Sequence, residues 1–150
     1  MESNKHQLSL RIILEQPPAG VDFGLQKGRG SLYDTVQTQR SASSDLSFEF
    51  TVEVEFAGKD LEPSFRGPFV QGPREERFVY IDIGTMAGQA HTPWSRRLKV
   101  PLRGITLAMI KQSMAKPGTV LEARVPGTGS DGGPSCASVK HFQGWTPASG

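Results

Sequence analysis

Hydrophobic and polar residues alternate strictly over residues 46–56. Every even position is apolar, from Leu46 to Phe56, and every odd position is polar, with three glutamates among them. A period of two residues places one set of side chains on a core and the other in water, which is the pattern of an antiparallel strand with one solvated face. This segment is the clearest strand in the sequence, and its length favours a bend or a bulge within it.

Weaker forms of the same alternation predict further strands. They fall at residues 8–14, 21–25, 98–102, 121–125 and 136–139. Residues 78–83 are apolar on both faces up to Asp82, which is typical of a central strand that is covered on both sides. Pro101 has no backbone N–H to donate to a ladder, so we expect the strand at 98–102 to lie at a sheet edge there.

One helix is predicted, over about residues 105–116. Leu107, Ile110 and Met114 have the spacing of a single apolar stripe on a helix. Thr106 is the expected N-cap, and residues 116–118, Lys-Pro-Gly, are the expected end. Many strands with one late helix predict a β-rich α+β fold. We expect a curved antiparallel sheet, or a partly closed barrel or sandwich, with the helix over one face or one open end.

The 150 residues suit a single domain with one core. We expect three loose segments in it. These are a flexible N-terminus (1–6), a mobile loop (37–45) in which Ala42 is the only apolar residue, and a loose C-terminal tail (145–150) from which Trp145 could still pack back on the domain.

Several features of the sequence favour a cytoplasmic protein that does not enter a membrane. The N-terminus has no apolar stretch of the kind found in signal peptides. The longest unbroken apolar run, residues 78–81, is far too short to span a bilayer. Cys136 is the only cysteine, so the chain cannot form an intramolecular disulfide.

The net charge of +2 is distributed unevenly. Residues 1–62 carry ten acids and six bases, whereas residues 63–150 carry five acids and eleven bases. The basic stretch at residues 94–103 could grip phosphates and stack a base, with Trp94, Arg96, Arg97, Lys99 and Arg103. We favour the alternative that Arg97 and Lys99 pair across strands with the glutamates of the 46–56 strand, so nucleic acid is not the expected partner.

The segment Phe65–Pro73 contains two Gly-Pro pairs, which fix tight bends around Phe69. Such a loop is either a rigid connector, which we favour, or a wall of a ligand site. As a wall it would offer the polar groups of Arg66, Gln71 and Arg74. Together with the basic stretch, it gives the candidate ligand-binding residues Arg66, Phe69, Gln71, Arg74, Trp94, Arg96, Arg97 and Lys99.

Residues 127–132 match the G-x-G-x-x-G pattern of dinucleotide-binding proteins. That site needs a helix after the glycines, whereas residues 133–139 predict a strand, so a hairpin that turns at Asp131-Gly132 fits better. We expect no cofactor. The spacing of the three histidines offers no metal site, so none is predicted.

Cys136 has His141 and Asp131 nearby, and an enzyme with a thiol nucleophile would need such groups. However, positions 136 and 141 face opposite ways on a regular strand. Free cysteine is also among the most buried residue types, so we favour a structural role.

Four segments resemble a bacterial family classed only as a domain of unknown function. They are Phe65–Gly72, Arg77–Tyr80, Arg96–Lys99 and Gly132–Ala137, and the resemblance extends over about residues 10–140. It implies a bacterial, intracellular protein and brings no catalytic residue with it, because the family has no assigned activity.

We therefore expect a small non-catalytic module that binds a small molecule or a protein partner where the helix and the Gly-Pro loop meet the sheet. The alternatives are a nucleic-acid-binding domain that uses residues 94–103 and an enzyme that uses Cys136.

Overall fold

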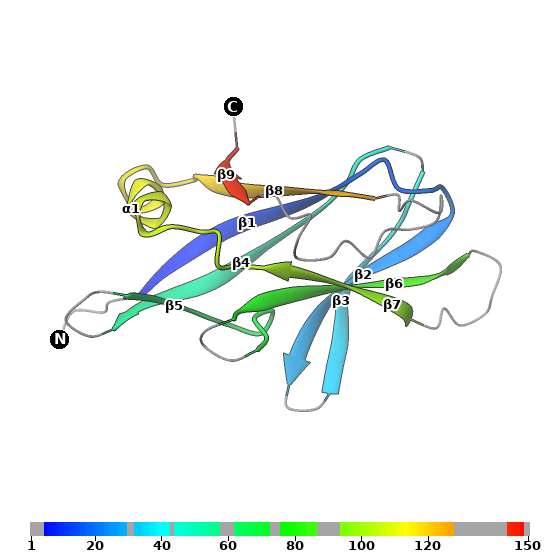
Figure 1. The fold of residues 1–150 in the computed structure, drawn as a ribbon, viewed down its shortest axis with the longest axis horizontal. Helices are drawn as coiled ribbons and strands as arrows, with labels where there is room; N and C mark the ends of the chain where they lie inside the picture. Colours follow the sequence, from blue (N-terminus) through cyan, green and yellow to red (C-terminus); the bar gives the residue numbers. More distant parts are fainter. Residues whose placement is uncertain are drawn as a thin grey trace.

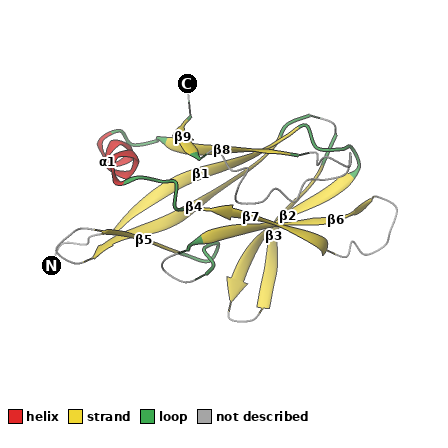
Figure 2. Cartoon of the chain, viewed as in Figure 1, coloured by secondary structure: helices red, strands yellow, loops and turns green. Residues whose placement is uncertain are grey.

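The computed structural model describes residues 5–29, 32–42, 44–57, 62–72, 76–86, 94–127 and 144–148. These residues are rich in strands and contain one helix, which confirms the predicted β-rich α+β fold (Figure 2). In chain order the elements are β1 (Lys5–Glu15), β2 (Val21–Arg29), β3 (Leu32–Arg40), β4 (Leu46–Ala57), β5 (Glu62–Arg66), β6 (Phe78–Met86), β7 (Trp94–Pro101), α1 (Leu107–Ala115), β8 (Val120–Pro126) and β9 (Trp145–Pro147).

The strands form two sheets that do not close into a barrel (Figure 1). Sheet A has the order β5-β4-β1-β8-β9, and sheet B has the order β3-β2-β6-β7. The inward side chains of both sheets form one hydrophobic cluster. The pairs are antiparallel except that of β1 with β8, which is parallel with Ser9 opposite Val120, so sheet A is mixed rather than wholly antiparallel.

The alternation of β4 appears in the structure as predicted. Its even positions from Phe48 to Val54 are buried, and its odd positions are exposed or half-buried. β4 pairs with β1 in one continuous register from Glu55 opposite Lys5 to Leu46 opposite Leu14, so this pairing does not contain the expected bulge. A register shift occurs instead between β2 and β3, at Leu25 and Gln26.

Two predictions about sheet B are also confirmed. β6 is a central strand between β2 and β7, and its Asp82 is only 3% exposed. β7, which ends at Pro101, is an edge strand.

Helix α1 begins and ends where the sequence predicts. Thr106 caps it, since its Oγ1 accepts a hydrogen bond of 3.2 Å from the Met109 backbone N–H. Gly118, with a φ of +90°, turns the chain toward β8 after the helix. The predicted stripe is only partly right, because Ile110 is buried but Met114 is 48% exposed.

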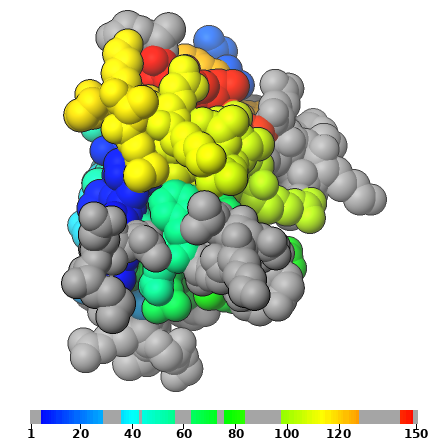
Figure 3. Space-filling model, turned by 90° about the vertical axis from the view of Figure 1, so that its left-hand side faces the viewer, coloured from blue at the N-terminus to red at the C-terminus, as the bar shows by residue number. Residues whose placement is uncertain are grey.

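Met114 is exposed because α1 lies at the end of the sheets, where only a narrow side of the helix is covered (Figures 1 and 3). On that side Ser113 is buried, and its Oγ lies 3.3 Å from His6 Nε2 of β1. In the part of the chain that the structure describes, no helix is long and apolar enough to cross a membrane.

The three segments expected to be loose overlap with strands. Lys5 and His6 belong to β1, and residues 37–40 complete β3, so the connection to β4 starts at Ser41. The tail was expected to be loose from residue 145, but residues 145–147 form β9, which pairs with β8, and Trp145 is 1% exposed. Burial of one large indole therefore anchors a segment that is otherwise polar.

Candidate ligand-binding site

The Gly-Pro loop connects the two sheets. It leaves β5 of sheet A and enters β6 of sheet B. On the way, the Pro68 carbonyl accepts a hydrogen bond of 2.9 Å from the Gly28 backbone N–H of β2. Phe69 packs on Phe50 of β4, with 5.4 Å between the ring centroids. These contacts are typical of a rigid connector, which is the interpretation that we favoured from the sequence.

The base of this loop is closely packed and contains polar atoms without partners. Gln71 exchanges two backbone hydrogen bonds with Phe78, of 2.8 and 3.1 Å. Its side chain lies against Gly28, where an added Cβ would overlap the Gln71 amide. Within the described residues, Gln71 Nε2 and Arg77 Nε are buried without a hydrogen-bond partner, and each such group costs about 1–3 kcal/mol.

The other candidate residues are dispersed. Arg66 lies on the outer face of β5 and pairs with Glu55 at 3.2 Å. Lys99 lies over the ring of Phe78, with Nζ 4.1 Å from the centroid, and pairs with Glu76 at 3.0 Å. The structure therefore brings Gln71 and Lys99 to the same residue, Phe78, and leaves Arg66 on the other sheet.

Several residues that were predicted to have a function lie outside the described part of the chain. These are Arg74, the side chains of Trp94, Arg96 and Arg97, and the set of Cys136, His141 and Asp131. The same applies to the Gly-rich motif beyond Gly127. The hypotheses of a nucleic-acid-binding domain and of an enzyme with a cysteine nucleophile therefore stay predictions. Among the residues that are described, no group of three His, Cys, Asp or Glu side chains could hold a metal ion.

The expected pairing of Lys99 and Arg97 with the glutamates of β4 is wrong for the described side chains. β4 lies in sheet A and β7 in sheet B, so the two strands never share a ladder. The glutamates pair instead with bases on their own sheet, in the pairs Glu49–Arg11, Glu53–Lys5 and Glu55–Arg66.

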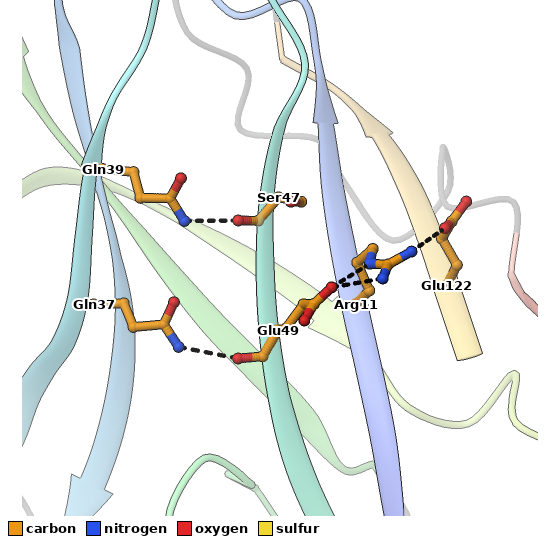
Figure 4. A network of polar contacts seen from close by, with 6 residues as sticks. All are labelled: Arg11, Gln37, Gln39, Ser47, Glu49 and Glu122. Atoms are coloured by element: carbon orange, nitrogen blue, oxygen red, sulfur yellow. Dashed lines mark hydrogen bonds and ion pairs between the residues drawn. The ribbon is translucent and has the colours of Figure 1, made fainter. Parts of the chain in front are cut away.

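Arg11, on the outer face of β1, forms the centre of this charged row (Figure 4). Its Nε donates to Glu49 Oε1 at 2.7 Å, and its Nη1 donates to Glu122 Oε2 of β8 at 3.2 Å. The hydrogen bonds that Arg11 donates to these two carboxylates, that to Glu49 first, raise the pKa of Arg11 above its ordinary value. The arginine is therefore fixed in place as a cation.

A cavity of about 360 Å³ lies beside Arg11, where the chain leaves α1 and enters β8. Its walls come from β1, from the end of α1 and the turn after it, from the start of β8 and from β9. They are formed by Arg11, Gln112, Lys116, Pro117, Gly118, Thr119, Val120, Pro147 and Ala148. We call this the α1–β8 cavity. Two of these residues are cations, and none of these residues is acidic.

A second hollow, of about 460 Å³, lies at the opposite ends of β1 and β8 and has a different character. Glu15, Gln16, Asp45 and Pro126 line it. Arg124 Nη1 lies 3.7 Å from a carboxylate oxygen of both Glu15 and Asp45, so its charge is shared between them. The two hollows thus differ in their lining residues, and the α1–β8 cavity, which has two basic and no acidic lining residues, is better suited to an anion.

Sequence reasoning missed the α1–β8 cavity. Residues 116–118 were interpreted only as the end of the helix, and Arg11 was considered only as part of a strand. Lys116, the residue directly after the helix, was the one signal available. The remaining walls are brought together by the parallel β1–β8 pairing and the short strand β9, neither of which the pattern predicted.

Fold and cavity together define a β-rich two-sheet protein with a small cavity whose lining contains two basic residues and no acidic one. The chain belongs to a family of unknown function, DUF5990, whose model matches residues 8–148. This confirms the resemblance noted in the sequence. Comparisons with curated proteins and with solved structures find no match.

Proposed function

We propose that this protein is a non-catalytic binding module that holds a small anionic molecule in the α1–β8 cavity. The observation that carries the proposal is the charge of the walls, where Arg11 and Lys116 face one hollow without an acidic lining residue. The two carboxylates that hold Arg11 also support it, because they orient the guanidinium before a ligand arrives. Preorganised cations bind anions with less loss of side-chain entropy.

Arg11 has hydrogen-bonding capacity left for a ligand. A guanidinium carries five N–H donors. The bonds to Glu49 use Nε and Nη2, and the bond to Glu122 uses Nη1, so these contacts occupy three of the five. The other donors, together with the amide of Gln112 and the ammonium of Lys116, suit a carboxylate or phosphate group.

The volume limits the size of the ligand. About 360 Å³ is at the lower end of the range for small-molecule sites, which runs from about 300 to 1,000 Å³. Pro117, Val120 and Pro147 add apolar side chains to the lining. The best candidates are therefore compact metabolites with one anionic group and a short carbon skeleton.

Thermal-shift measurements with a panel of small carboxylates and phosphate esters test this proposal. We expect at least one compound to raise the melting temperature, because a ligand that binds only the folded state stabilises it. Lys116→Met should weaken that effect. The matched control is Lys111→Met, since Lys111 is exposed on the same helix and does not line the cavity.

A second pair of variants tests the cavity itself. Gln112→Trp should fill it and abolish the shift, whereas Lys111→Trp should not. Equal behaviour of the two members of either pair, or the absence of stabilisation by every anion, would contradict the proposal.

A further inference from the structure

The side of the sandwich where β3 approaches β4 is held by side chains rather than by a strand ladder. β5 pairs with residues 53–57 of β4, so residues 46–52 extend beyond its end. There, Gln37 Nε2 donates to the Glu49 carbonyl at 3.0 Å, and Gln39 Nε2 donates to the Ser47 carbonyl at 2.6 Å (Figure 4). We call this contact the β3–β4 seam.

The two carbonyls have the spacing that a neighbouring strand would require. Ser47 and Glu49 are two residues apart, which is the repeat at which one edge of a strand presents its acceptors. The glutamine amides therefore occupy positions that the backbone N–H groups of an added strand would take. Both hydrogen bonds are exposed to solvent, where exchange of one donor for another costs little.

β3 itself is suited to separating from β4. It is the edge strand of sheet B, and its register with β2 shifts beside Val36, which faces no residue of β2. Val36 is 49% exposed and is one of two large apolar side chains that the described residues leave exposed. An exposed apolar residue next to Gln37 in the chain gives an incoming strand a point of contact.

The outward row of β4 determines the charge of the partner. Glu49 is the acidic outward residue of the 46–52 segment, and its side chain remains 62% exposed although it pairs with Arg11. Glu53 and Glu55 continue the row. β4 has no basic residue of its own. In an antiparallel pair, basic side chains of an added strand would lie directly opposite or diagonal to these carboxylates.

We propose that the β3–β4 seam is a docking edge for an extended peptide segment of a partner protein that carries basic residues at alternate positions. The segment pairs with residues 46–52 of β4 and displaces the amides of Gln37 and Gln39. Its other residues are apolar and pack beside Val36. No residue of 46–52 lines the α1–β8 cavity, although Glu49 also pairs with Arg11 there, and this proposal does not depend on the proposed function.

The test uses a fluorescent heptapeptide of alternating Lys and Val, and a Glu-Val peptide of the same length. Binding to the full chain is measured by anisotropy at low salt. Replacing Gln37 and Gln39 by Ala should raise the affinity for the Lys-Val peptide about tenfold, because two competing donors are removed. Thr38→Ala is the control, since Thr38 is exposed and lies between the two glutamines on the opposite face of β3.

A second variant, Glu49→Gln, should lower the affinity for the Lys-Val peptide and leave the fold intact. Because Glu49 also pairs with Arg11, its control is Glu122→Gln, which removes the other carboxylate partner of Arg11 outside the seam and should leave the affinity unchanged. Hydrogen exchange should show new protection of the amides at residues 46–52 in the complex. Three outcomes would overturn the proposal: equal affinities of the double variant and the Thr38→Ala control, equal binding of the two peptides, or protection elsewhere. Self-association of the double variant without peptide would also overturn it, by showing that a second copy fills the seam.

Discussion

On each of the two open sides of the sandwich, side-chain N–H groups donate hydrogen bonds to backbone carbonyls, but one side is exposed to solvent and the other is buried. At the β3–β4 seam, two glutamine amides donate to backbone carbonyls in contact with solvent. On the other side, between β7 and β9, the Trp145 indole N–H donates to the Pro101 carbonyl at 2.9 Å in a buried position. We call this second contact the β7–β9 seam. Burial, rather than the bond itself, makes one seam a permanent closure and the other an exchangeable one.

The largest expected effect is at the β7–β9 seam. Trp145→Ala removes a fully packed indole and leaves the Pro101 carbonyl without its donor, so we expect a loss of about 3–5 kcal/mol in the free energy of unfolding. Urea titration followed by circular dichroism measures it. Thr146→Ala, an exposed neighbour on β9, should change the value by no more than about 0.5 kcal/mol. A similar loss in both variants would show that the short strand, and not the buried indole, closes this side.

A smaller effect is expected at the base of the Gly-Pro loop, near the β3–β4 seam. In Gly28→Ala the new methyl group would overlap the Gln71 side chain, and we expect a loss of about 1–3 kcal/mol from overpacking. Gln71→Ala in the same chain should restore part of it, because it removes both the overlap and the unpartnered amide. Additive effects in a double-mutant cycle would contradict the contact between these two residues.

The smallest effect is expected from the glutamines of the β3–β4 seam. Gln37→Ala and Gln39→Ala together should lower the free energy of unfolding by only about 1 kcal/mol, because water replaces each exposed donor. The same urea titration measures it, with Thr38→Ala as the reference. A loss as large as that of Trp145→Ala would mean that both seams are permanent closures, and it would remove the basis for strand exchange.

Sequence alone predicted strands in which apolar residues on one face alternate with polar residues on the other. β1 and β4 were recognised because Leu8 and Phe48 belong to rows of alternating apolar residues that are buried in the structure. No strand was predicted at β3, and its last residues were expected to be a mobile loop, because the segment from Gln37 to Arg40 contains no apolar residue. β9 was missed for another reason: it has only three residues, and its position follows from the pocket for Trp145 rather than from a local pattern.

The candidate site was less accessible to such reasoning. The Gly-Pro loop stood out in the sequence, but its contacts with Gly28 and Phe50 are those of a connector. The walls of the α1–β8 cavity come from segments that are far apart in the sequence, and Arg11 reaches them only because β1 and β8 pair in parallel. Composition and spacing do not carry that information, since parallel pairing of distant strands has no local signature.

The parallel pairing of β1 with β8 also has a consequence for how the chain folds. Ser9 pairs with Val120, so one edge of β1 stays unpaired until a strand more than a hundred residues further along the chain has formed. Contacts between such distant residues slow folding, because a long loop must close before they form. In the meantime the apolar face and open edge of β1 are available to other molecules, and nascent or heat-stressed chains should aggregate through residues 8–14.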